Sequence, residues 1–147
     1  MTQLNTYLTF NGNCMQAFHF YQSVFGGEFA AKSYFKDMPD DPQLQLSEAD
    51  KNKIMHVSLP IGNTSVLMGS DTIGELEGGF VQGNNFTVSI NADSQDEADR
   101  LFKRLSNKGV ETMPMNQTFW GSYFGMLTDQ FGIQWMISFD HTRENHD

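Results

Sequence analysis

The sequence predicts an α+β protein built from two copies of a β-α-β-β-β unit. Polar and apolar residues alternate through residues 4–10 and again through 85–91, which is the period of a half-buried strand. Each stretch runs through a short polar turn into a segment whose apolar residues recur every three or four positions, as in a helix. Leu8 and Val88 lie 80 residues apart, and Ala17 and Ala98 lie 81 apart. A fixed long period indicates two copies of one supersecondary unit.

The first copy begins with the strand at 4–10 and continues into a helix at 14–27. Asn11 or Asn13 is available to cap this helix, and Gly26 and Gly27 end it. A strand at 28–35 and an exposed polar loop at 36–52 follow. The copy ends with a hairpin formed by strands at 54–61 and 64–70.

The second copy follows a glycine-rich linker and repeats the same order of elements. Ser94, with Glu97 three residues later, has the spacing of a capping box at the start of a helix that ends at Gly109. A strand is predicted at Val110–Gln117, and a final strand pair at Ser122–Thr128 and 133–139. We expect one domain over 1–147, with modules at about 1–71 and 85–140, a linker at about 72–84, and a frayed tail at 141–147.

Composition excludes several classes of function. The net charge of −9 argues against binding to nucleic acid or to anionic membranes, since both need basic patches. A single cysteine, Cys14, rules out an intramolecular disulfide and a site with several thiolates. The first residues show no basic start followed by an apolar stretch, and no run has membrane-spanning length. These observations predict a soluble, cytoplasmic protein.

The duplicated unit resembles the vicinal-oxygen-chelate superfamily, which includes glyoxalase I, bleomycin-resistance proteins and extradiol dioxygenases, and within it the PhnB-like branch. The segments that carry the resemblance are 7–13, 17–18, 20–21, 25–27, His56, 67–71, 119–121, 124–125, 128–129, 131–132 and 135–137. The resemblance implies that the two modules form a curved, cup-shaped mixed sheet with the helices outside and the site on the concave face. It also implies a homodimer, because a half-open cup is commonly completed by a second chain.

Metal-dependent members of this superfamily place His or Gln at the start of each module's first strand and Glu in its last strand. Here those positions hold Asn5 and Asn85, then Met136 and either Leu67 or Met68. Neutral amides and thioethers are poor ligands for a hard divalent cation, which prefers carboxylate oxygens or imidazoles. The sequence therefore predicts no metal and no cofactor.

Alternation along the strands predicts which side chains line the cup. Phe86, Val88 and Ile90 should pack on the second helix, as Leu8 and Phe10 should pack on the first. The residues expected to line a pocket are Asn5, Tyr7, His56, Asn85, Thr87, Trp120, Tyr123, Gln134 and Met136.

Each of the reactive side chains also has a structural interpretation. His56 is the only candidate for acid–base chemistry, but a histidine in a half-buried sheet is often satisfied by a backbone carbonyl. Trp120 can belong to the core or to a pocket mouth. Cys14 is expected to be inert. Asp71 and Asp129 follow strands and are expected to stabilise turns.

The function predicted from these residues is small-molecule binding, with the ligand unidentified. The alternative is a lyase, isomerase or dioxygenase that uses His56, either metal-free or with a displaced metal held also by Glu75 or Glu77. A third possibility is a dimeric protein whose cup is filled by Phe and Met side chains. PhnB-like proteins are sometimes named as methyltransferases, but the sequence has no strand, Gly-rich loop and helix to seat a nucleotide-like cofactor.

Overall fold

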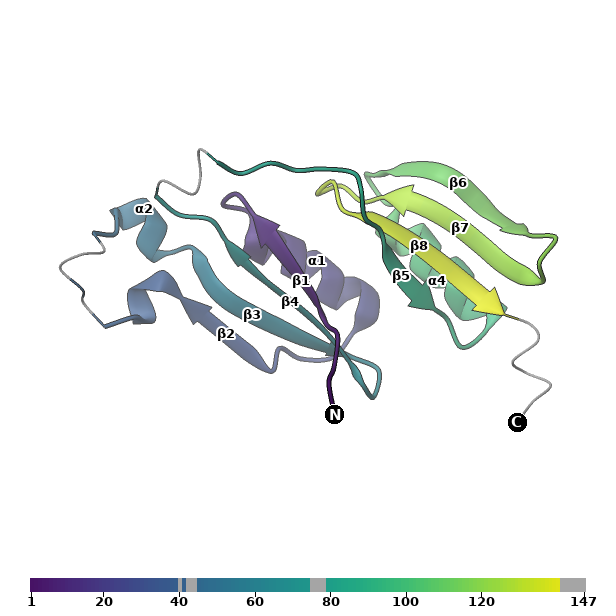
Figure 1. Ribbon diagram of the computed structural model, residues 1–147, viewed down its shortest axis with the longest axis horizontal. Helices are drawn as coiled ribbons and strands as arrows, with labels where there is room; N and C mark the ends of the chain where they lie inside the picture. The colour runs from purple at the N-terminus through teal and green to yellow at the C-terminus, as the bar shows by residue number, and fades with distance from the viewer. Residues whose placement is uncertain (40, 42–44, 75–78, 141–147) are drawn as a thin grey trace. The chain divides into compact units, whose positions relative to one another are not determined.

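The computed structural model describes residues 1–39, 41, 45–74 and 79–140 (Figure 1). The chain divides into two compact units, Met1–Val81 and Gln82–Asp147. Each unit has a four-stranded mixed sheet with one long helix, so the predicted β-α-β-β-β order is confirmed in both. The predicted tail at 141–147, and Glu75 and Glu77, lie outside the described residues. None of the helices among the described residues combines the length and the apolar composition that a membrane span requires.

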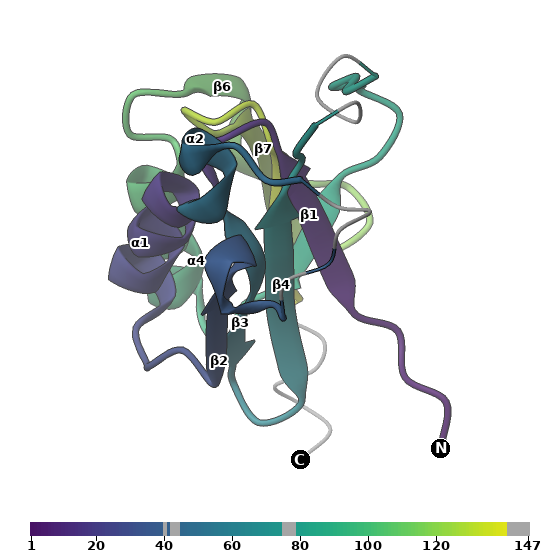
Figure 2. The same ribbon diagram turned by 90° about the vertical axis from the view of Figure 1, so that its left-hand side faces the viewer.

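The first unit has the strand order β1-β4-β3-β2, with β1 parallel to β4 and the other pairs antiparallel. Its elements are β1 (Thr6–Phe10), α1 (Cys14–Phe25), β2 (Ala31–Tyr34), η1 (Phe35–Asp37), α2 (Glu48–Lys51), β3 (Ile54–Ile61) and β4 (Ser65–Asp71). The side view shows α1 against one face of this sheet (Figure 2). The opposite face of each sheet is called its open face below. The segment 36–52, which the sequence predicts to be an exposed loop, contains α2 and most of η1.

The core of the first unit lies between α1 and the sheet. Leu8 and Phe10 are buried and the intervening Thr9 is exposed, which confirms the predicted faces of β1. Phe18 on α1 packs over Gly69, where an added Cβ would lie 2.6 Å from the Phe18 ring and 2.9 Å from the Leu8 carbonyl oxygen. Glycine at this strand position is what allows the helix to approach so closely.

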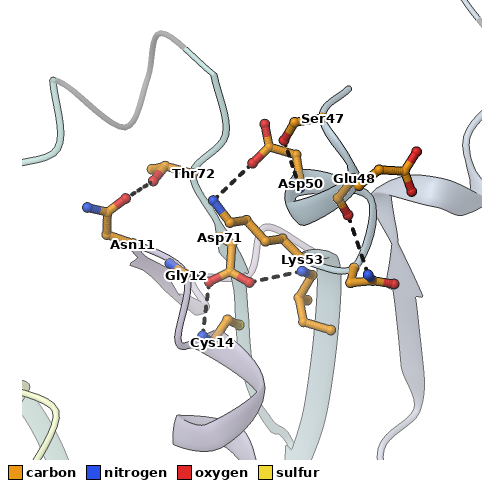
Figure 3. Close-up of polar contacts among 11 residues, drawn as sticks. Asn11, Gly12, Cys14, Ser47, Glu48, Asp50, Lys53, Asp71 and Thr72 are labelled. Carbon is orange, nitrogen blue, oxygen red and sulfur yellow. Dashed lines mark hydrogen bonds and ion pairs between the residues drawn. The ribbon is translucent and has the colours of Figure 1, made fainter. Parts of the chain in front are cut away.

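The start of α1 is capped from a distant strand rather than by the predicted asparagines. Asn13 stands at the N-cap position but its side chain makes no capping hydrogen bond. The buried Asp71 carboxylate instead accepts hydrogen bonds from the backbone N–H groups of Gly12, Cys14 and Ile54, at 3.0, 2.9 and 2.9 Å (Figure 3). A carboxylate beside free N–H groups at a helix start satisfies them and interacts favourably with the helix dipole. Asp71, the last residue of β4, therefore links the start of α1 to the start of β3 through hydrogen bonds.

The second unit has the matching strand order β5-β8-β7-β6, with β5 parallel to β8. Its elements are β5 (Val88–Asn91), α4 (Gln95–Leu105), β6 (Val110–Gln117), β7 (Ser122–Thr128) and β8 (Gln134–Asp140). The Ser94 hydroxyl accepts a hydrogen bond from the Glu97 backbone N–H at 3.1 Å, which confirms the predicted cap. Figure 1 shows α4 behind the sheet formed by β5, β8, β7 and β6.

The first strand of the second unit is shorter than its alternation predicts, and one expected core residue is exposed. The ladder between β5 and β8 begins only at Val88, opposite Trp135. Phe86 precedes the ladder and 59% of its surface is exposed, so the prediction that it packs on the helix is wrong. Without a partner strand to hold its backbone, the alternation before Val88 no longer fixes which face a side chain takes.

Candidate functional site

On the open face of the first unit, the structure brings together two of the predicted residues. The rings of Tyr7 on β1 and His56 on β3 stack with centroids 5.9 Å apart and an interplanar angle of 28°. Tyr7 stands opposite Met68 in the ladder with β4, and 48% of its surface is exposed. The pair therefore forms an accessible aromatic platform on a rigid sheet.

Two serines are neighbours of His56 in the first sheet. Ser33 of β2 is directly opposite His56, and Ser58 of β3 lies two residues along the same strand. Ser58 is only 7% exposed, between Ala31 and Met68 in the ladders. Neutral hydroxyls can donate or accept hydrogen bonds, so this arrangement suits a polar, uncharged group of a ligand.

Asn5 lies just outside the sheet, before β1 begins. It lines a surface groove of about 280 Å³ together with residues before and at the start of β1 and residues around the start of β4, namely Gln3, Leu4, Thr6, Thr64, Ser65 and Val66. Tyr7 and His56 are not among the residues that line this groove. Asn5 therefore lines a groove to which the Tyr7–His56 platform does not contribute.

On the open face of the second unit, Gln134 and Met136 of β8 alternate with the buried Trp135 and Ile137, as predicted. The Gln134 side-chain amide donates a hydrogen bond to the Phe86 carbonyl oxygen at 3.0 Å, which holds the segment leading into β5. Asn85 and Thr87 belong to that segment, before the strand; Asn85 is exposed and Thr87 is half-buried.

Trp120 lies in the tight turn between β6 and β7 and is 59% exposed. Its ring meets that of Phe124 edge-on, with centroids 6.2 Å apart. Phe124 stands opposite Ser138 in the ladder between β7 and β8, so it shares the open face with Met136. Trp120 therefore belongs to the rim of this face and not to the core.

Tyr123 lies on the other side of the sheet from these residues. It stands opposite Phe139, whose side chain is buried beneath α4, and its hydroxyl donates a hydrogen bond to the Asp99 carboxylate at 2.6 Å. This hydrogen bond to a carboxylate raises the pKa of Tyr123, with partial burial adding to the effect. The structure thus separates Tyr123 from Trp120, Gln134 and Met136.

Leu67 and Met68, the two first-unit candidates for the position of a metal-binding Glu, lie on different faces of the sheet. Leu67 is buried on the helix side, whereas Met68 is half-buried on the open face beside Tyr7. The open face therefore presents thioethers, at Met68 and Met136, at positions where the family resemblance led us to look for a carboxylate. In the described part of the chain, no three His, Cys, Asp or Glu side chains are grouped so that they could hold a metal ion. This donor set does not fit a hard divalent cation.

Several open-face residues were absent from the predicted pocket lining, among them Met126 and Ser33. Met126 stands between Met113 and Met136 in the ladders of β7, and Ser33 stands opposite His56. Alternation within β7 places Met126 on the face opposite Leu127, which is the signal that could have found it. Ser33 could not have been paired with His56 from sequence, because a bulge shifts the register between β2 and β3.

Comparison with known proteins identifies the family of this chain. The model of the Glyoxalase/Bleomycin resistance protein/Dioxygenase superfamily matches residues 3–137. The chain belongs to this superfamily. It is 31% identical to protein YjdN of Escherichia coli K12 over 141 residues, which cover 92% of this chain and 93% of that protein.

Solved structures of two bacterial proteins are similar to this chain over almost its whole length. Protein PA1353 of Pseudomonas aeruginosa is 37% identical, with a TM-score of 0.80 over 95% of this chain and 98% of that one. The PhnB protein of Bacillus cereus is 22% identical, with a TM-score of 0.70 over 94% of this chain and 99% of that one. The predicted likeness to PhnB-like proteins is thus confirmed at the level of the fold.

Proposed function

We propose that this superfamily member binds a small organic molecule and does so without the hard divalent cation used by metal-dependent relatives. The observation that carries the proposal is the Tyr7–His56 stack on the open face of the first unit, which offers ring surface and polar atoms next to each other. Ligand sites commonly combine aromatic walls with a few well-placed hydrogen-bonding groups. Ser33, which is half-buried opposite His56, offers such a group.

The test is a thermal-shift screen against metabolites and antibiotics, followed by the same measurement on variants. A ligand present at about 100 times its Kd stabilises the folded state by about 2.7 kcal/mol. We expect Tyr7→Ala and His56→Gln to reduce the shift given by a hit, and His19→Gln to leave it unchanged. His19 is a suitable control because it is an exposed histidine on α1, in contact with Phe29 rather than Tyr7.

The competing proposal is an enzyme in which His56 is the acid–base group or a ligand of a displaced metal. Its half-buried ring next to a tyrosine and opposite a serine is compatible with proton transfer. Metal analysis of the purified protein separates the metal-dependent form of this enzyme from the metal-free proposal. Stoichiometric Zn, Ni, Mn or Fe that is lost in His56→Ala would reject the metal-free proposal.

The homodimer stays a prediction, drawn from the way that related cups are completed by a second chain. Sedimentation equilibrium at several protein concentrations tests it. A mass of twice the 16.7 kDa of one chain is expected, and a mass of one chain at all concentrations would reject it.

A further inference from the structure

We propose that the open face of the second unit binds flat, uncharged aromatic rings; this inference rests on the proposed small-molecule function and names the class of ligand. Three methionines are register partners across neighbouring strands of this sheet, although the register shifts on both sides of Met113. Met113 of β6 is opposite Met126 of β7, and Met126 is opposite Met136 of β8. Side chains directly opposite each other on one sheet face are close neighbours.

A row of thioethers has a chemical preference. Methionine sulfur is polarizable and makes favourable contacts with aromatic rings, and its unbranched side chain adapts to different outlines. Met126 and Met136 are half-buried and Met113 is 45% exposed, so the row can be reached from the open side of this sheet. The row thus offers a soft apolar floor for a flat ring.

Aromatic side chains stand next to this floor. Phe124 is two residues from Met126 on the same strand and the same face, and Trp120 meets the Phe124 ring edge-on. Phe119 is 98% exposed and meets Trp120 edge-on, with centroids 4.9 Å apart. Two large aromatic side chains in one exposed turn leave apolar surface in water, which is typical of an interaction site.

The turn that carries Trp120 is held rigidly. The Thr118 backbone N–H and hydroxyl both donate to the Ser122 carbonyl oxygen, at 2.9 and 2.6 Å, and the Gly121 N–H donates to the Thr118 carbonyl at 3.3 Å. Gly121 has a φ of +90°, a conformation that glycine adopts without strain. The backbone that carries Trp120 is therefore constrained by these hydrogen bonds, which lowers the entropy cost of ordering the turn when a ring binds there.

The charge on this face favours an uncharged ring. Of the described residues on the open face of β5, β7 and β8, Asp140 at the end of β8 carries a charge. The polar residues around Met136 are neutral, namely Ser89, Gln134 and Ser138. A charged ligand would lose hydration on this floor without gaining an opposite charge near its centre.

The test is NMR of protein carrying ¹³C-labelled methionine methyl groups, titrated with 2-naphthol and, separately, with decahydro-2-naphthol. The two compounds share a carbon skeleton, but the second is saturated and not flat. We expect 2-naphthol to shift the signals of Met113, Met126 and Met136 and to leave those of Met15 and Met55 in place. Signals are assigned by single Met→Leu replacements, which conserve side-chain volume.

Variants should weaken the binding of 2-naphthol in a graded way. Trp120→Ala should raise its Kd about tenfold, the size of a typical aromatic contact. Met126→Leu should raise it about threefold, since the apolar volume stays and the sulfur is lost. Phe29→Ala, which removes an aromatic ring from the first unit, should leave it unchanged. Dispersed methionine methyl signals in each variant show that it is folded.

Three results would overturn the inference. They are equal shifts with decahydro-2-naphthol, no shift of the three methionines, or shifts that follow protein concentration without ligand, which would mean that a second copy covers the face. The proposed function is judged separately, because its hits must depend on Tyr7 and His56. Such a hit together with no response to 2-naphthol would reject the aromatic-ring inference alone.

Discussion

Tyr7 and His56 stack across the first sheet, with ring centroids 5.9 Å apart, although they come from strands that are not neighbours. β4 lies between β1 and β3, so the two rings meet over its open face. The contact is long-range in the chain, and it unites two residues that sequence patterning predicts separately. The stack defines the centre of the proposed binding face.

This stack should contribute measurably to stability. In a double-mutant cycle with Tyr7→Ala and His56→Ala, we expect a coupling of about 0.5–1 kcal/mol, because aromatic pairs add about that much beyond area burial. Urea unfolding followed by circular dichroism measures it. The matched cycle with Tyr7→Ala and His19→Ala should give a coupling near zero. Equal couplings in the two cycles would contradict the stacking geometry.

Replacement of Asp71 should destabilise the protein strongly. Asp71→Ala leaves the N–H groups of Gly12, Cys14 and Ile54 without their acceptor, and we expect a loss of about 3 kcal/mol or more in the free energy of unfolding. Urea unfolding gives the value. Asp93→Ala, at an exposed position before α4, should change stability by only about 0.5 kcal/mol. A small effect at Asp71 would mean that water replaces its hydrogen bonds.

The thiol of Cys14 should make stability fall at high pH. Burial, and next the nearby Asp71 carboxylate, raise its pKa far above the ordinary 9.0. Above pH 9 the unfolded chain releases the thiol proton while the folded protein keeps it, so each pH unit favours unfolding by up to about 1.4 kcal/mol. Below pH 9 this contribution does not change with pH.

The comparison that isolates Cys14 is with Cys14→Ala. Unfolding free energies measured from pH 7 to 10.5 should decline less steeply in the variant above pH 9. Reaction of the folded wild-type protein with a thiol reagent at pH 8 should also be slow and should become fast in urea, since the side chain is fully buried. Parallel pH profiles for the two proteins would reject the raised pKa.

Tyr123→Phe should separate stability from binding. The change removes the hydrogen bond to Asp99, and we expect a loss of less than about 1.5 kcal/mol, as is typical of a single exchanged hydrogen bond. Because Tyr123 lies on the helix side, the affinity for a ligand of the open face should stay the same. If the folded variant lost its affinity for the ligand, Tyr123 would be part of the ligand site.

Local patterns in the sequence determined much of the fold. The two repeated β-α-β-β-β units, the burial of Leu8 and Phe10 and the cap at Ser94 were all predictable, because each depends on residues a few positions apart. The faces of Trp135 and Met136 followed in the same way from two-residue alternation. Superfamily membership was also recognisable at this level.

Only the tertiary structure decided the features that depend on which strands pair and in what register. It capped α1 with Asp71, exposed Phe86 before the β5–β8 ladder, and placed Tyr123 under α4. It also made Met113, Met126 and Met136 register partners across neighbouring strands. Alternation assigns a side chain to one of two faces within a strand, whereas contacts between strands are set by hydrogen-bond register and bulges that the local sequence does not specify.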